Sequence, residues 1–178
     1  MIIDLKTITG APRRFDFALE PEWWLSDDDT GQVLGLDGPL ACQMDIARAG
    51  IKYIIDGTLV GAIFSVCDRC LETFRRELDL SFRLFLSSNY PDKGEFEVEL
   101  TEDDLSEQFI KGDEVELNDL VREQIYLSLP MKSLCREDCS GLCPVCGANL
   151  NKESCQCRRA KAPQGLAKLR SLILDGEQ

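Results

Sequence analysis

Nine cysteines are the residues of this chain best suited to chemistry, and eight of them form four close pairs. The pairs are Cys67 with Cys70, Cys135 with Cys139, Cys143 with Cys146, and Cys155 with Cys157. Closely spaced thiols bind metal, form redox couples or form disulfides. The chain has no histidine, so a zinc site here must consist of thiolates, and histidine acid–base chemistry is excluded.

The pairs predict two zinc sites of four thiolates each. Residues 143–147 read Cys-Pro-Val-Cys-Gly, the form of a metal knuckle in which the turn directs backbone N–H groups at the sulfurs. Cys155 and Cys157 return after a short loop and would complete this site. The other two pairs would form a second site that ties a sheet to the carboxyl-terminal module across a long intervening segment. We expect the ninth cysteine, Cys42, to be a small buried apolar residue.

A closed four-sulfur site has no open coordination position, so the pattern favours a structural role and not an enzyme. Iron–sulfur ligation by the same cysteines stays open, because thiolates suit both metals. A redox couple of Cys67 and Cys70 is also open, although the sequence lacks the βαβ setting of thioredoxin-like pairs. The spacing of Cys139, Cys143 and Cys146 matches a radical-SAM motif, but that chemistry needs a large barrel, for which this chain is too short. No glycine-rich phosphate loop is present.

The amino-terminal residues contain no basic segment followed by an apolar one, and no long apolar run follows. We therefore expect a cytoplasmic protein without membrane contact. In that compartment paired thiols bind metal more often than they form disulfides.

Hydrophobic periodicity predicts the elements around the cysteines. Residues 41–47 and 51–60 predict a β-hairpin, with Gly57 and Gly61 marking bulges or bends, and the period of two in residues 74–86 predicts another strand. A short strand is expected at 96–100, a helix capped by Asn118 and stopped by Pro130, and an amphipathic helix within 162–173.

Together these elements predict an α+β fold. A curved antiparallel sheet with a covering helix should occupy residues 1–130, and a small cysteine-rich zinc module with a basic terminal helix should occupy residues 131–178.

The net charge of −12 is distributed unevenly. Residues 90–123 hold 13 acidic and 3 basic residues, whereas residues 131–174 hold 8 basic and 3 acidic residues. The basic end is the expected nucleic-acid contact, because lysine and arginine bind phosphates without reading sequence. The candidate phosphate contacts are Lys152, Arg158, Arg159, Lys161, Lys168 and Arg170.

Four ordered segments, CDRCLETF, LPMKSLC, GLCPVCGANLN and LAKLRSL, resemble the YceD family of bacterial and plastid proteins over residues 36–172. The resemblance implies a part in accumulating large-subunit ribosomal RNA, and it carries the family's cysteine motifs onto the eight paired cysteines. Some relatives lack the second cluster. The stretch KAPQG, before LAKLRSL, departs from the acidic-proline form of the family.

We therefore expect a non-enzymatic, zinc-binding ribosome-biogenesis factor whose partner is large-subunit rRNA or a large-subunit ribosomal protein, with no small-molecule substrate. One alternative is an acidic carrier of a basic ribosomal protein. Another is a thiol oxidoreductase that uses Cys67 and Cys70.

Overall fold

The computed structural model describes residues 1–25, 31–87, 107–110 and 112–157, and the chain forms two compact units. The first, here called the sheet unit, comprises Met1–Val66 and Phe74–Ser133. The second, here called the cysteine unit, comprises Cys67–Thr73 and the chain from Leu134 onward. The short connection between two strands of the sheet unit therefore belongs to the cysteine unit.

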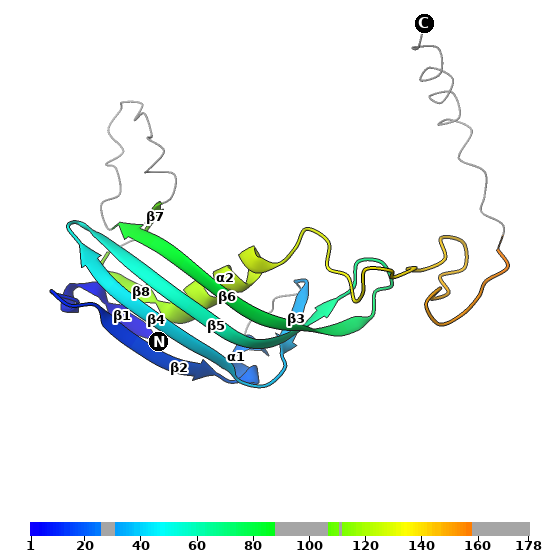
Figure 1. Cartoon of the computed structure of the whole chain (residues 1–178), viewed down its shortest axis with the longest axis horizontal. Coiled ribbons are helices and arrows are strands. Elements are labelled where there is room, and N and C mark those ends of the chain that lie inside the picture. Colours follow the sequence, from blue (N-terminus) through cyan, green and yellow to red (C-terminus); the bar gives the residue numbers. More distant parts are fainter. Residues whose placement is uncertain (26–30, 88–106, 111, 158–178) are drawn as a thin grey trace, which may run out of the picture. The chain divides into compact units, whose positions relative to one another are not determined.

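The main sheet of the sheet unit has the strand order β2-β4-β5-β6-β7, and β3 also pairs with β5. Its strands are β2 (Arg13–Leu19), β3 (Val33–Leu36), β4 (Leu40–Ala49), β5 (Lys52–Val66), β6 (Thr73–Ser87) and β7 (Glu107–Phe109). The strands β1 (Ile2–Asp4) and β8 (Glu114–Glu116) form a separate two-stranded sheet, and the 3-10 turn η1 (Leu5–Thr7) follows β1. The long strands β4, β5 and β6 curve together (Figure 1), which confirms the expected α+β fold with a curved sheet.

The predicted hairpin is formed by β4 and β5, which are antiparallel with Ala49 opposite Lys52. Its turn contains Gly50 at a φ of 66°, a left-handed conformation that glycine adopts without a steric penalty. The expectation of a wholly antiparallel sheet is wrong at one edge, because β7 pairs with β6 in parallel. A strand of three residues has too short a pattern for its direction to be predicted. The strand expected at 96–100 and the helix expected within 162–173 lie outside the described residues.

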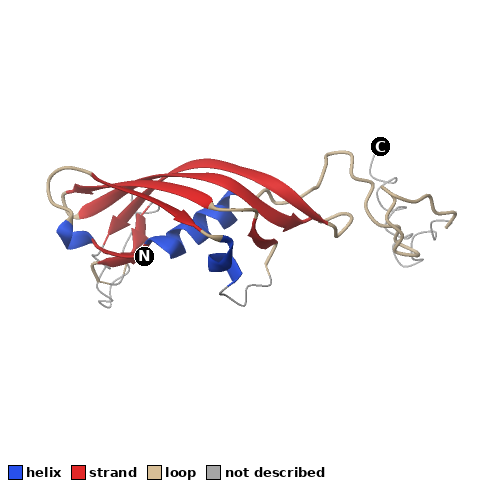
Figure 2. Ribbon diagram, turned by 90° about the horizontal axis from the view of Figure 1, so that it is seen from below, coloured by secondary structure: helices blue, strands red, loops and turns tan. Residues whose placement is uncertain are grey.

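The second helix of the sheet unit, α2 (Leu117–Ser128), covers one face of the sheet (Figure 2). It ends just before Pro130, as predicted. The predicted cap is wrong, since Glu116 occupies the N-cap position and Asn118 lies within the first turn. Apolar side chains of α2 and of the strands share one core, which includes Leu40, Met44, Ile46, Ile55, Leu59, Leu120, Val121 and Ile125.

Aromatic contacts join the first helix, α1 (Pro21–Leu25), to α2. The guanidinium carbon of Arg122 lies 5.0 Å from the ring centroid of Trp23 and 4.9 Å from that of Trp24. The Trp24 and Tyr126 rings are 5.7 Å apart. Both tryptophans of the chain therefore report on the packing of the sheet unit.

Of the bulge or bend predicted at Gly57, a bulge toward β4 is wrong, because the register between β4 and β5 runs without a shift from Ala41 to Ala49. The ring of Phe82 on β6 occupies the space that a side chain at position 57 would need, with its Cζ only 2.1 Å from the position of a Cβ. Gly57 therefore serves close packing within a regular strand.

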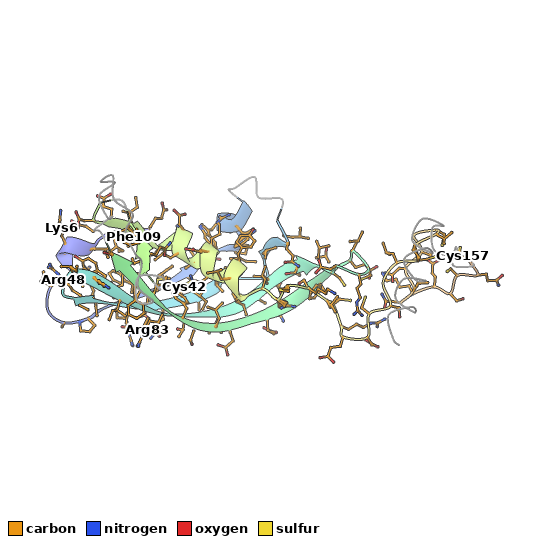
Figure 3. All side chains as sticks on the ribbon, turned by 90° about the horizontal axis from the view of Figure 1, so that it is seen from above. Lys6, Cys42, Arg48, Arg83, Phe109 and Cys157 are labelled. Carbon is orange, nitrogen blue, oxygen red and sulfur yellow. The ribbon has the colours of Figure 1, made fainter. Side chains whose placement is uncertain are left out.

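The face of the sheet opposite α2 is polar. Asp45 and Asp56 stand directly opposite each other on β4 and β5, an unfavourable like-charge pair. Arg14 on β2 binds both carboxylate oxygens of Asp45 at 2.9 and 2.8 Å, and Arg83 on β6 binds both oxygens of Asp56 at 2.6 and 3.0 Å. Arg83 points away from the helix-covered face (Figure 3), so this row of four charges is exposed to solvent.

No helix in the described part of the chain combines the length and apolarity needed to cross a membrane.

Candidate metal centre

The first pair of cysteines lies in the connection between β5 and β6. The backbone N–H of Cys67 donates to the carbonyl of Glu72 at 2.9 Å, and the N–H of Leu71 donates to the carbonyl of Cys67 at 2.8 Å. These two bonds fold residues 67–72 into a tight turn. Leu71 adopts a left-handed φ of 59° to close it.

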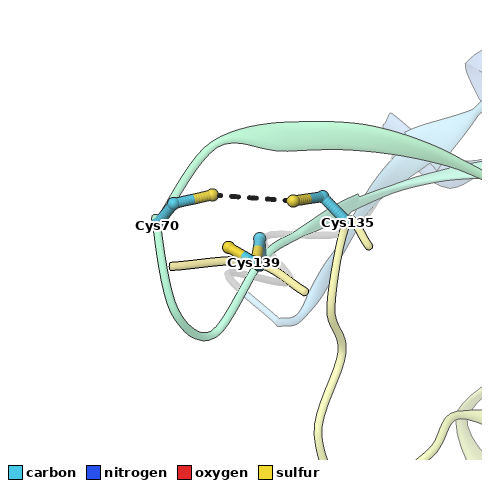
Figure 4. Close-up of side chains that lie close together, drawn as sticks. Cys70, Cys135 and Cys139 are labelled. Atoms are coloured by element: carbon cyan, nitrogen blue, oxygen red, sulfur yellow. Dashed lines mark hydrogen bonds between the residues drawn. The ribbon is translucent and has the colours of Figure 1, made fainter. Parts of the chain in front are cut away.

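The first group of four thiols, here called site A, consists of Cys67, Cys70, Cys135 and Cys139. The Cys67 and Cys139 sulfurs are 3.8 Å apart, and so are the Cys70 and Cys135 sulfurs. Figure 4 shows Cys70, Cys135 and Cys139 converging on one point. All four sulfurs lie within 4.8 Å of one another, and three of the four residues are buried.

Four thiolates that bind one tetrahedral ion at about 2.3 Å must lie about 3.8 Å from each other. The sulfur separations in site A match this edge length. A disulfide would bring two sulfurs to about 2.0 Å, and a cluster of several iron atoms would hold the four sulfurs farther apart. The site therefore fits a single tetrahedral metal ion.

The second group, here called site B, consists of Cys143, Cys146, Cys155 and Cys157, whose sulfurs also lie within 4.8 Å of one another. Its knuckle repeats the turn of site A: the N–H of Cys143 donates to the carbonyl of Ala148 at 2.8 Å, and the N–H of Gly147 donates to the carbonyl of Cys143 at 2.9 Å. Gly147, at a φ of 75°, occupies the position of Leu71. In site B Cys143 is buried, whereas Cys146 is exposed.

Hydrogen bonding and burial divide the thiols of each site into easily and poorly ionised groups. Burial opposes ionisation of Cys67, but donated N–H bonds from Cys135, Cys70 and Arg69 outweigh it and lower the pKa of this thiol to about 6. Backbone N–H groups of Cys146 and Val145 lower the pKa of Cys143 to about 6.

The partner thiols behave in the opposite way. Burial and the neighbouring Cys67 raise the pKa of Cys135 to about 12, and the neighbouring Cys146 raises the pKa of Cys157 to about 12. The thiols with a lowered pKa, Cys67 and Cys139 in site A and Cys143 in site B, therefore ionise readily, and their anionic charge opposes ionisation of the neighbouring thiols. A bound cation removes this conflict, because it stabilises all four thiolates together.

Hydrogen bonds of Arg69 and a close approach of Gly141 join the two knuckles within the cysteine unit. Arg69 donates from Nη1 to the carbonyl of Cys139 at 2.8 Å, and its own carbonyl accepts the N–H of Leu142 at 3.0 Å. Gly141, at a φ of 72°, packs so closely that a Cβ there would lie 2.9 Å from the Arg69 carbonyl oxygen. The structural role of Arg69 and Gly141 was not apparent from the sequence, which gives no signal of a close approach between the two segments.

Lys152 is the one candidate phosphate contact that lies among the described residues. Its ammonium group forms an ion pair with Glu72, directly after the first knuckle. Glu72 in turn has its pKa lowered, first by the hydrogen bond from Lys152. Lys152 thus has an intramolecular partner in the cysteine unit. The candidates Arg158, Arg159, Lys161, Lys168 and Arg170 lie outside the described residues.

Comparison with known proteins identifies the family. The model of the family described as large ribosomal RNA subunit accumulation protein YceD matches residues 55–173. The chain belongs to the YceD family. The matched range includes every cysteine of both sites.

Curated relatives extend this result. The protein named large ribosomal RNA subunit accumulation protein YCED homolog 1, chloroplastic, from Arabidopsis thaliana is 25% identical over 75% of this chain and 48% of its own length. Its namesake from Zea mays is 28% identical over 76% of this chain and 54% of its own length. An uncharacterized protein of Mycobacterium tuberculosis (strain ATCC 25618 / H37Rv) is 29% identical over 70% of this chain and 55% of its own length.

The chain thus spans about half the length of the curated relatives it matches. No solved structure gives a significant match.

Proposed function

We propose that this protein is a non-enzymatic ribosome-biogenesis factor that binds one zinc ion at each of its two cysteine sites and supports the accumulation of large-subunit rRNA. The observation that carries the proposal is the pair of four-thiol groups, each gathered within 4.8 Å. The printed names of the family and of its plant relatives supply the process. A cytoplasmic location belongs to the proposal, because a reducing compartment keeps the thiols available for metal.

Zinc is the metal proposed because its ordinary protein sites are closed tetrahedra of thiolate sulfur. A single iron ion would adopt the same geometry, so the choice is tested by elemental analysis of protein purified under reducing conditions. Two equivalents of zinc per chain are expected, together with a colourless solution. If the protein instead contains stoichiometric iron and absorbs visible light, iron takes the place of zinc in this proposal.

The role of the cysteine unit is to present a surface of fixed shape, since four protein ligands leave zinc no position at which to activate water or substrate. The rival oxidoreductase needs Cys67 and Cys70 to exchange electrons with a disulfide. Zinc bound at these thiols would block that exchange. The rival therefore predicts a metal-free pair that cycles with a disulfide substrate and loses activity in Cys67→Ser.

RNA contact is proposed to come from the basic carboxyl-terminal residues. Ultraviolet crosslinking of the tagged protein in growing cells, followed by sequencing of the bound RNA, should give reads concentrated on large-subunit rRNA. Mass spectrometry of the same sample identifies co-purifying proteins.

A matched pair of variants tests whether the crosslinking depends on the basic carboxyl-terminal residues. Arg158→Gln/Arg159→Gln should lower the RNA yield, because each lost phosphate contact weakens binding and reduces its salt dependence. Arg13→Gln/Arg48→Gln removes the same charge from exposed residues of the sheet unit and should leave the yield unchanged.

The acidic carrier is the second candidate function, and the net charge of −12 favours it. A carrier would bind a basic ribosomal protein through complementary charge, and its association would weaken steeply with salt. Background RNA recovery, with one basic ribosomal protein dominating the co-purified material, would establish this function in place of RNA binding.

A further inference from the structure

We infer that Asn151 couples the two metal sites, so that occupation of site B strengthens metal binding at site A. The inference rests on the proposed binding of zinc at both sites. Asn151 lies in the loop between the two ligand pairs of site B, yet its side chain contacts a ligand of site A.

The amide of Asn151 is fully engaged, and its partners fix its orientation. Its Oδ1 accepts from the backbone N–H of Ser140 and from the guanidinium of Arg136, both at 2.8 Å. Two donors at one atom identify that atom as the oxygen. The NH₂ group must then face the other way.

That NH₂ group meets two acceptors. Nδ2 donates to the sulfur of Cys139 at 3.3 Å and to Oδ1 of Asn149 at 2.9 Å. A hydrogen bond donated to a thiolate favours its charged form, in which it binds metal.

The position of this amide depends on the loop that site B closes. Asn149 Oδ1 also accepts the backbone N–H of Asn151 at 3.0 Å, and the N–H of Leu150 donates to the carbonyl of Gly141 at 2.9 Å. The loop begins at the Cys143 and Cys146 knuckle and returns to Cys155. A metal ion at site B fixes both ends of this loop, and with them the donor to Cys139.

The coupling is tested on the full chain with four proteins: the wild type, Asn151→Asp, Cys155→Ser/Cys157→Ser, and the combination of these changes. Zinc affinity at site A is measured by competition with a chromophoric chelator under reducing conditions. Asn151→Asp keeps an oxygen for Ser140 and Arg136 but replaces the donor to Cys139 with an anionic acceptor.

We expect Asn151→Asp to weaken site A by about 10–100-fold, the usual effect of losing an outer-shell partner. Disrupting site B should weaken site A by a similar factor. The combined protein should be no weaker than either change alone, because both remove the same hydrogen bond. Gln164→Glu is the control: it makes the same amide-to-carboxylate change seven residues beyond Cys157, the last ligand in the chain, and should leave site A unchanged.

A spectroscopic readout separates this role from a general effect on folding. With cobalt in site A, Asn151→Asp should shift the sulfur-to-cobalt charge-transfer band, because one thiolate loses a hydrogen bond, whereas Gln164→Glu should not. The inference is overturned if Asn151→Asp binds zinc at site A within threefold of the wild type, or if the two losses add. A wild-type chain that holds fewer than two zinc ions would instead overturn the proposed function.

Discussion

The sheet unit and the cysteine unit are stabilised by different means. The sheet unit buries a continuous set of apolar side chains between its strands and α2. Among the described residues of the cysteine unit, those classed as buried are Cys67, Cys70, Cys139, Cys143 and Gly141. The described residues of this unit form no apolar core, and a segment of this size without one does not fold alone, so the proposed metal ions would supply most of its stability.

Removal of metal should therefore unfold the cysteine unit, whereas the sheet unit should lose stability but stay folded when the crosslink at site A is released. The sheet unit should depend on Gly57, Phe82 and the core below α2. The cysteine unit should depend on its thiolates and on the backbone geometry of the two knuckles.

Removing zinc with a strong chelator under reducing conditions should unfold the cysteine unit and leave the sheet unit folded. Structural zinc contributes roughly 10–16 kcal/mol of apparent binding free energy, all of it available to folding. Amide hydrogen exchange in residues 134–157 should therefore accelerate by at least ~10³-fold, while the fluorescence of Trp23 and Trp24 stays native. Added zinc should reverse the change and added magnesium should not, because thiolates do not suit magnesium. Loss of the native tryptophan signal on chelation would show that the sheet unit needs the metal too.

Opening site A should destabilise the sheet unit more than opening site B does. Site A joins cysteines 65 and 72 residues apart, and the segment between them contains β6, β7, β8 and α2. Cys135→Ser/Cys139→Ser in excess zinc should lower the free energy of unfolding of the sheet unit by roughly 3–5 kcal/mol, the effect of releasing a long closed loop.

The matched variant Cys155→Ser/Cys157→Ser opens a short loop outside the sheet unit and should change that free energy by less than ~0.5 kcal/mol. Guanidinium unfolding followed by tryptophan fluorescence measures both. Equal losses in the two variants would contradict the assignment of the long crosslink to site A.

Much of the sheet unit could be predicted because its signals are local and repetitive. The alternation in residues 74–86 and the paired apolar runs around Gly50 give β4, β5 and β6 directly. The cap at Asn118 was wrong because the side-chain pattern alone does not fix which residue begins the first turn. The parallel pairing of β7 depends on a long connection, for which no local pattern exists.

The cysteine pairing was accessible from spacing, but the contacts between the two sites were not. These contacts involve Asn151, Arg69 and Gly141, which meet backbone carbonyls and a sulfur of other segments of the chain. The Asn149-x-Asn151 repeat between two ligand pairs was the available signal, because asparagines in short loops hydrogen-bond nearby backbone groups.

Gly57→Ala should destabilise the sheet unit without altering zinc content. A Cβ at this position would lie 2.1 Å from Phe82 Cζ, so the ring must move from its place in the core. Overpacking of this kind costs about 1–3 kcal/mol. The double variant Gly57→Ala/Phe82→Leu should recover part of the loss, since the smaller side chain makes room. Full stability in Gly57→Ala by urea unfolding would show that Phe82 has another position available.

The smallest expected effects are on zinc release, and they come from changing the residue that closes each knuckle. The two knuckles share a backbone turn, but a leucine closes one and a glycine closes the other. Leu71 and Gly147 both have positive φ, at 59° and 75°. A left-handed conformation costs a residue with a Cβ about 1–2 kcal/mol, a penalty that glycine avoids.

Leu71→Gly should therefore slow zinc release from site A, and Gly147→Ala should accelerate release from site B, each by a factor of about 5–10 for ~1 kcal/mol. Leu71 is 64% exposed, so its replacement removes little buried apolar surface to offset the gain. Release is followed with a chromophoric chelator, and site-specific loss is assigned with the Cys155→Ser/Cys157→Ser variant. If Leu71→Gly and Gly147→Ala both slow zinc release, or both accelerate it, backbone strain is not what distinguishes the knuckles.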